Sequence, residues 1–216
     1  MLKLYYSPGA CSMAPHILLE EIGVPYEPVL VSISEGKTRA PEYLAINPKG
    51  RVPALLTAEG EILTEVPAIS CYLAEHSHGV KLLPQGGLPL ARCLEWFNWL
   101  SGTVHTMAFG QYWRAHRFLD DEKLFPPLKD KGRRNILDHF AFIEGRLKDR
   151  NWAVGQAYTA VDAYLLVFFR WGHRIGLDMR PAYPHWTRHA ERVLERPAVQ
   201  RTLQQEGVSA WGPPEQ

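Results

Sequence analysis

The sequence predicts an α/β region over residues 1–78, followed by an all-helical region over residues 90–216. Three observations support this prediction. Strand-like and helix-like segments alternate through the first region, residues 79–89 are rich in glycine and proline, and only helical spacing of apolar residues follows. A chain of 216 residues, of which 46% are hydrophobic, can give each region its own core, so residues 79–89 are interpreted as a linker.

The first region begins with a strand, a helix and a second strand. Leu2–Tyr6 has strand composition, and Ile17, Leu18 and Ile22 recur at helical spacing. The later part of residues 24–33 has the composition of a second strand. Because a helix with short connections joins the two strands, we expect them to be parallel, with a right-handed crossover.

Two more strands and two more helices complete the first region. Residues 41–46 are expected to form a short helix. A hairpin turn at 58–61 separates strands at 53–57 and 62–63. The last helix begins at Pro67, where the missing N–H of proline is not needed, and runs to about residue 77.

The turn between the first strand and the first helix contains Cys11. A Pro-Gly pair forms the turn, so Cys11 lies in or just before the first helical turn. Free N–H groups and the helix macrodipole favour an anion there, and they can lower a thiol pKa from about 8.5 to roughly 3.5–7.5. Position alone leaves two interpretations open: a reactive or ligand-facing cysteine, or a small, inert, buried one.

Composition excludes several functions. The net charge is +1 with no block of like charge, so we expect no nucleic-acid partner, and the longest apolar run, at 163–169, is too short to cross a membrane. The first residues lead directly into a strand, so no signal peptide is expected. Cys11, Cys71 and Cys93 lack the spacing of a disulfide framework or zinc site, which favours a reducing cytoplasm, and the histidines lack metal-ligand spacing.

The second region begins with two long helices, at about 90–114 and 128–148. Their apolar residues recur at intervals of three or four, which is typical of a helix with one buried face. These residues are Leu94, Phe97, Leu100 and Val104 in the first helix, and Ile136, Phe140, Ile143 and Leu147 in the second.

A third helix begins after residue 158. Thr159 and Asp162 have the spacing of a capping box, with Asp in place of the usual Glu. Two shorter helices are expected at 184–195 and 198–206, and an extended tail at 208–216. The apolar residues of the third helix are Val161, Tyr164, Leu165 and Phe168.

Several motifs carry a resemblance to a known family. The segments YSPGACS (6–12), NPKGRVPAL (47–55) and TEVPAI (64–69) together resemble the glutathione-binding half of bacterial beta-class glutathione S-transferases. GQAYTAVDAY (155–164) is similar to the capping-box segment of the same family. The resemblance implies a thioredoxin-like N-terminal domain, a C-terminal helical bundle domain and a cytoplasmic, detoxifying homodimer. It assigns Thr159 and Asp162 to folding.

The resemblance also implies a glutathione site. Pro53 corresponds to the family's cis-proline, Val52 would pair its backbone with the tripeptide, and Glu65 would bind the γ-glutamyl ammonium. Taken alone, Glu65 is interpreted as a charge that stabilises a helix end, and the resemblance is what assigns it to the ligand. Val66 departs from the small residue common in the family and offers only its N–H to the γ-glutamyl carboxylate. The full set of glutathione-binding residues is Tyr6, Ser12, Lys37 (for the glycine carboxylate), Val52, Pro53, Glu65, Val66, Asn98 and Thr103.

By the same resemblance, Cys11 and His105 are the catalytic residues, with His105 bonding the sulfur or a nearby water. The alternative for a lone helical histidine is a surface or core position. No metal is expected, and no cofactor beyond glutathione itself as co-substrate. An apolar pocket for the electrophile would be lined by Met107, Phe109, Tyr112, Trp113 and Trp171.

The resulting hypothesis is a glutathione transferase that conjugates the glutathione thiol to small hydrophobic electrophiles, with thiol–disulfide chemistry through Cys11 as a second activity. Two alternatives stay open. One is a glutathione-dependent monothiol oxidoreductase. The other is a non-catalytic stress protein that binds glutathione or hydrophobic ligands, an alternative that Val66 and Pro67 keep open.

Overall fold

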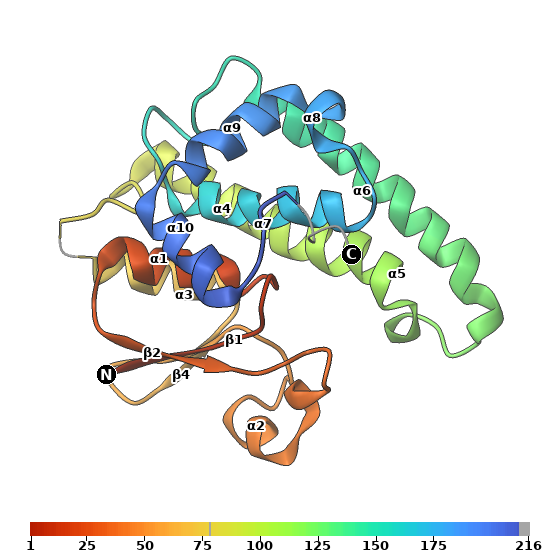
Figure 1. The fold of residues 1–216 in the computed structure, drawn as a ribbon, viewed down its shortest axis with the longest axis horizontal. Coiled ribbons are helices and arrows are strands. Elements are labelled where there is room, and N and C mark those ends of the chain that lie inside the picture. The colour runs from red at the N-terminus through yellow and green to blue at the C-terminus, as the bar shows by residue number, and fades with distance from the viewer. Residues whose placement is uncertain (78, 212–216) are drawn as a thin grey trace.

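The computed structural model describes residues 1–77 and 79–211 (Figure 1). Strands and helices alternate up to residue 75, and helices alone follow from Gly87, so the predicted fold class is confirmed. From residue 212 onward, the predicted extended tail lies outside the described residues. Among the helices of the described ranges, none combines the length and the apolar composition needed to cross a membrane.

A four-stranded sheet with the order β2-β1-β3-β4 organises the N-terminal part. β1 (Leu2–Tyr6) pairs with β2 (Tyr26–Leu30) in parallel, through the connecting helix α1 (Met13–Ile22), as predicted. β3 (Ala54–Leu56) runs antiparallel to both β1 and β4 (Ile62–Thr64).

The second strand lies earlier than predicted, at Tyr26–Leu30 instead of at the end of residues 24–33. Its register explains the difference. Leu2 lies opposite Tyr26 and Tyr6 lies opposite Leu30, so every residue of β1 already has a partner when β2 ends. Beyond Leu30 the chain turns away after one more hydrogen bond, from the Val31 N–H to the Tyr6 carbonyl at 2.7 Å.

Helices cover both faces of this sheet. α1 and α3 (Val66–Glu75) lie between the sheet and the helical part of the molecule in Figure 1. The short η1 (Lys37–Arg39) and α2 (Pro41–Ile46) belong to the opposite side. There Tyr5 packs against Tyr43, with ring centroids 5.9 Å apart. The sheet therefore lies between two packed layers.

The first long helix of the second region is continuous from Gly87 to Trp113 but changes its winding. It consists of α4 (Gly87–Trp99), the π-helical η2 (Leu100–Phe109) and α5 (Gly110–Trp113). The prediction that Leu94 is buried is wrong, because its side chain is exposed. Cys93 takes its place, since a spacing of four residues from Phe97 reaches the same buried face.

After the short turns η3 (Ala115–Arg117) and η4 (Glu122–Leu124), α6 spans Phe125–Leu147. Its predicted buried residues are all confirmed. The helix begins earlier than expected because Pro126 and Pro127 fall within its first turn, where a missing N–H leaves no bond unmade.

α7 (Ala160–Arg174) crosses the centre of the helical part, and its side chains are buried on every face up to Gly172. Around it lie α9 (Pro184–Leu194), α10 (Pro197–Glu206) and the single turn α8 (Met179–Ala182). The sequence analysis missed α8, since one turn is too short to show helical periodicity.

The capping box at the start of α7 is present. Asp162, which is fully buried, accepts hydrogen bonds from the N–H of Thr159 at 2.7 Å and the N–H of Ala153 at 2.8 Å. It also contacts His189 Nε2 of α9 at 2.7 Å. One carboxylate thus joins the helix start, the preceding loop and a neighbouring helix.

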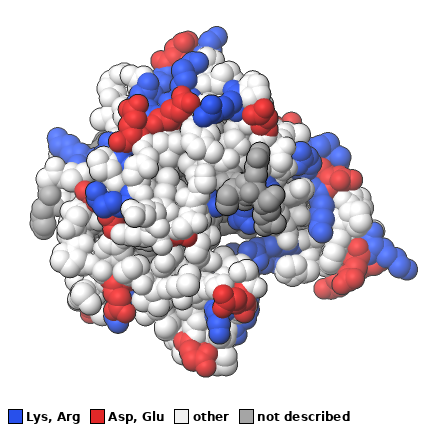
Figure 2. Space-filling model, viewed as in Figure 1, with Lys and Arg blue, Asp and Glu red and all other residues white. Residues whose placement is uncertain are grey.

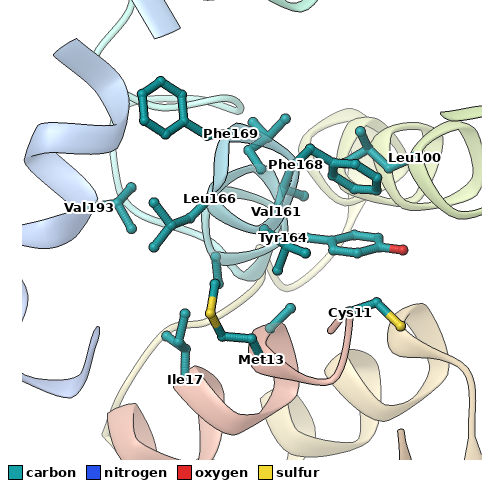
Figure 3. Close-up of a cluster of buried hydrophobic side chains, with 14 of the residues drawn as sticks. Cys11, Met13, Ile17, Leu100, Val161, Tyr164, Leu166, Phe168, Phe169 and Val193 are labelled. Atoms are coloured by element: carbon teal, nitrogen blue, oxygen red, sulfur yellow. The ribbon is translucent and has the colours of Figure 1, made fainter. Parts of the chain in front are cut away.

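The N-terminal and helical parts share one hydrophobic core. Figure 3 shows Met13 and Ile17 of α1 directed toward Leu166 and its neighbours on α7. Tyr164 of α7 and Cys11, just before α1, point to the same side of this cluster. Because α7 packs directly on α1, the helical part fixes the position of the α1 N-terminus.

Candidate active site

The turn that carries Cys11 is closed by its own polar groups. Ser12 caps α1, and its hydroxyl accepts the N–H of Ser7 at 3.1 Å and donates to the Ser7 carbonyl at 3.2 Å. The Ser12 side chain is fully buried. It therefore holds the turn together, although its predicted role was contact with glutathione.

Residues of the helical region bind the same turn at Gly9. The Gly9 N–H donates to Glu206 Oε2 at 2.7 Å, and its carbonyl accepts the indole N–H of Trp171 at 2.9 Å. Arg170 approaches so closely that a Cβ on Gly9 would lie 2.2 Å from Nη1, and Gly9 has φ +61°, so only glycine fits. The second oxygen of Glu206 bonds His16 Nδ1 of α1 at 2.8 Å, with both side chains fully buried.

Pro53 lies opposite this turn, and the Val52–Pro53 peptide bond is cis, as predicted. The Cys11 thiol donates to the Val52 carbonyl at 3.4 Å. The carbonyl of Arg51 accepts the Tyr43 hydroxyl at 2.7 Å and the Asn47 side-chain amide at 2.6 Å. These two bonds fix the loop that presents the Val52 edge to Cys11.

Of the two interpretations left open for Cys11, the electrostatics of the fold favours the buried thiol. Burial raises the pKa of the Cys11 thiol to about 12, and the carboxylate of Glu65 adds to the rise. The N–H groups of Cys11 and Ser12 and the guanidinium of Arg114 act in the opposite direction but are weaker. The favourable effect of the helix N-terminus is outweighed because Cys11 is only 8% exposed and its thiol loses hydration.

We therefore expect slow alkylation of Cys11 by iodoacetamide at neutral pH, since the thiolate is the nucleophile. The rate should rise about tenfold for each unit of pH, because the pKa of about 12 keeps the thiolate a minor species throughout. Peptide mass spectrometry can follow Cys11 separately from Cys71. A rate that levels off near pH 7 would contradict the raised pKa.

Glu65 immediately precedes α3. Its backbone has φ 75° and ψ 128°, and a positive φ is uncommon for residues other than glycine. Such a non-glycine outlier is typical of functional positions. Lys49 Nζ binds Glu65 Oε1 and Thr64 Oγ1, each at 2.8 Å, and the Glu65 side chain is 61% exposed. Val66 is buried behind it, and Lys37 is exposed in η1.

Comparison with known proteins decides the family. Residues 9–76 match the glutathione S-transferase N-terminal domain, and residues 120–197 match the glutathione S-transferase C-terminal domain. The chain is 36% identical over 211 residues to the glutathione S-transferase GstA of Escherichia coli O157:H7, covering 96% of this chain and all of that one. This chain belongs to the glutathione S-transferase family.

Solved structures agree with this assignment. A glutathione transferase homologue from Sulfitobacter, with bound glutathione, has a TM-score of 0.90 at 31% identity, covering 97% of this chain and 99% of that one. The beta-class glutathione S-transferase of Sphingomonas chungbukensis has a TM-score of 0.84 at 32% identity, covering 96% and 100%. The thioredoxin-like sheet and the helical part therefore form a glutathione S-transferase fold.

In this transferase the glutathione-site residues predicted for the helical region lie on α4 and η2. Asn98 is exposed, while Thr103 and His105 are half-buried. The His105 ring packs against Trp171, with centroids 4.8 Å apart. Burial lowers the pKa of His105 to about 4, and the positive charge of Arg114 lowers it further, so the imidazole is neutral at neutral pH.

The residues predicted to line the electrophile pocket differ in burial. Phe109 and Trp171 are buried in an aromatic cluster, with ring centroids 5.0 Å apart. Tyr112 and Trp113 are half-buried, and Met107 is exposed. Tyr112, Trp113 and Met107 are therefore the members of this set with surface open to solvent.

Sequence reasoning missed other residues of this transferase site. Glu206 holds the Cys11 turn from a helix near the C-terminus, and no local pattern links the two. The Tyr164 hydroxyl, predicted only as core, is buried and finds no hydrogen-bond partner in the described part of the chain. Arg51 and Arg114 come from distant segments, and only the fold places them close enough for their charges to repel. Within residues 1–77 and 79–211, no group of His, Cys, Asp and Glu forms a metal site.

Proposed function

We propose that this transferase binds glutathione along the Val52 edge, with the γ-glutamyl ammonium at Glu65 and the sulfur beside Cys11. One observation carries the proposal: the Val52 edge and the N–H groups of Cys11 and Ser12 meet at the start of α1. A thiolate placed there gains hydrogen bonds and the favourable end of the helix.

The proposed reaction is conjugation to a small electrophile with an apolar body. The glutathione thiol releases its proton to water, and the thiolate attacks the electrophilic carbon. With an aryl chloride, the C–S bond forms and chloride leaves with the electron pair of the C–Cl bond. The neutral imidazole of His105 orients the sulfur, and binding both reactants side by side supplies much of the rate gain.

Replacement of Glu65 by glutamine tests this arrangement. The KM for glutathione should rise about 10- to 100-fold, because a hydrogen bond to a charged group contributes roughly 1.5–3 kcal/mol. The change in kcat should be smaller, since the ammonium is bound equally in the ground and transition states. Initial rates with chlorodinitrobenzene measure both constants.

Glu61→Gln provides the matched control, because Glu61 is exposed on the turn before β4. Its KM should equal that of the wild type. An unchanged KM in Glu65→Gln would contradict the proposed ammonium site. Wild-type protein that binds no glutathione and adds nothing to the uncatalysed rate would contradict the proposed function as a whole.

A thiol–disulfide cycle through Cys11 is the weaker alternative, because the raised pKa keeps that thiol protonated. Cys11→Ala should therefore conjugate chlorodinitrobenzene at nearly the wild-type rate while losing any mixed disulfide with glutathione. The protein is further proposed to act in the cytoplasm as a homodimer. Exposed Leu94 and Phe142, on α4 and α6, support a subunit interface that light scattering can test.

A further inference from the structure

Four arginines from three separate segments lie near one another beside the proposed site: Arg39 at the end of η1, Arg51 just before Val52, and Arg114 and Arg117 after α5. The Arg39 guanidinium lies over Gly50, where a Cβ would be 2.8 Å from its Nη1. Arg117 is tied to Arg114 by a hydrogen bond from its N–H to the Arg114 carbonyl at 2.9 Å.

These groups are close enough to act on one another. Burial lowers the pKa of Arg114 and of Arg117, and repulsion from Arg51 and Arg39 lowers both further. Arginine nevertheless stays protonated at neutral pH, so the cluster is strongly cationic. Figure 2 shows Lys and Arg atoms in the hollow between the lobe that carries α2 and the arm that carries α5 and α6.

The cluster has no internal counter-charge. Within residues 1–77 and 79–211, no carboxylate oxygen lies within 4.0 Å of any of the four guanidinium groups. Three arginines elsewhere do have such a partner: Arg92 pairs with Glu95, Arg196 with Glu21, and Arg201 with Glu20. Grouping like charges without a partner is unfavourable for the free protein, and it makes this surface suited to attract an anion.

Arg114 lies close enough to Cys11 and His105 for its charge to act on both side chains. Its charge opposes the rise in the Cys11 pKa and contributes to the fall in the His105 pKa, so it acts on both residues beside the proposed sulfur position. It follows directly after Tyr112 and Trp113, whose half-buried rings offer an apolar surface beside the charge. Arg114 and this surface therefore belong to the helical wall of the site.

Glutathione alone does not use all of this positive charge. It carries two carboxylates and one ammonium, and the proposed site gives the ammonium to Glu65 and the γ-glutamyl carboxylate to the Val66 N–H. The glycine carboxylate can be met by Lys37, Arg39 and Arg51, which all belong to the N-terminal part. Arg114 and Arg117 remain unpaired on the opposite wall, where the electrophile enters.

Resting on the proposed conjugation, we propose that the natural second substrate is an anionic electrophile, with an apolar or aromatic body and a carboxylate group. The carboxylate binds Arg114 and Arg117, which suit it because guanidinium groups match carboxylate geometry. The apolar body lies against Tyr112 and Trp113, and the electrophilic carbon faces the glutathione sulfur.

Two aryl chlorides test this inference: chlorodinitrobenzene and chlorodinitrobenzoate, the same ring bearing a carboxylate. With each, the glutathione thiolate forms a C–S bond, chloride leaves, and the thiol proton passes to water. The measured quantity is kcat/KM for the anionic ring divided by kcat/KM for the neutral ring. Comparing this ratio between variants cancels the different intrinsic reactivities of the two rings.

The ratio should fall about 10- to 100-fold in Arg114→Gln, and in Arg117→Gln as well, because each variant loses a charged contact to the carboxylate. Arg114→Lys should restore part of the ratio, since it keeps the charge but loses the planar fork. Added salt should lower the wild-type ratio by screening. Arg188→Gln, an exposed position on α9, should leave it unchanged.

Equal losses with both electrophiles in Arg114→Gln would overturn the inference and assign Arg114 to the glutathione thiolate instead. A ratio that is the same in all variants would also overturn it, while turnover of the neutral ring would leave the proposed conjugation intact. If the wild type turned over neither ring, although calorimetry detected glutathione binding, the proposed function and this inference would both fall.

Discussion

Replacing Glu206 by alanine is expected to destabilise the protein by about 3–5 kcal/mol, because it leaves a buried network without its carboxylate. Both oxygens of Glu206 are in use, one by His16 Nδ1 at 2.8 Å and one by the Gly9 N–H at 2.7 Å. At roughly 2–4 °C per kcal/mol for a chain of this size, Tm should fall by about 10 °C. Calorimetric or circular-dichroism melting measures it.

The same variant should also weaken catalysis, since Gly9 belongs to the turn that holds Cys11. Glu191→Ala is the matched control, as Glu191 is exposed on α9. A cycle with His16→Ala separates the network from general packing: Glu206→Ala should be less damaging once His16 is absent. A Tm equal to that of the control would refute the role assigned to Glu206.

Asp162→Ala should produce a loss of similar size, about 3–5 kcal/mol, through a different network. The substitution removes the acceptor of the Thr159 and Ala153 N–H groups and the partner of His189, all in a fully buried position. Unsatisfied buried donors are costly because water cannot replace the lost partner. Urea unfolding measures the change.

Two comparisons make this prediction specific. Asp138→Ala, at an exposed position on α6, should change the free energy of unfolding little. Asp162→Asn keeps an acceptor oxygen and should fall between wild type and alanine. If Asp162→Ala unfolded at the same urea concentration as Asp138→Ala, the capping network would not be a source of stability.

The sequence predicted the order of elements well, because strand composition, helical spacing and Pro-Gly turns are local signals. The prediction failed where packing against another segment of the chain decides where an element ends or which face of it is buried. β2 ends at Leu30 because β1 has no further residue to pair with. Leu94 is exposed and Cys93 buried because two faces of a helix can both satisfy a spacing of three or four, and only packing selects one.

The same distinction between local motifs and long-range packing applies to the candidate site. The turn at Cys11 and the cis-proline at Pro53 follow from motifs contiguous in the chain. The Cys11 pKa does not, because the desolvation that raises it comes from packing against distant elements. Glu206 and Arg114 were missed for the same reason, as each acts on residues far away in the sequence.

The position of bound glutathione tests the central claim most directly. A crystal structure with glutathione should place the cysteine of the tripeptide against the Val52 backbone, its sulfur beside the N–H groups of Cys11 and Ser12, and its ammonium at Glu65. Glutathione bound elsewhere on the molecule, or with its sulfur directed away from the start of α1, would contradict the account.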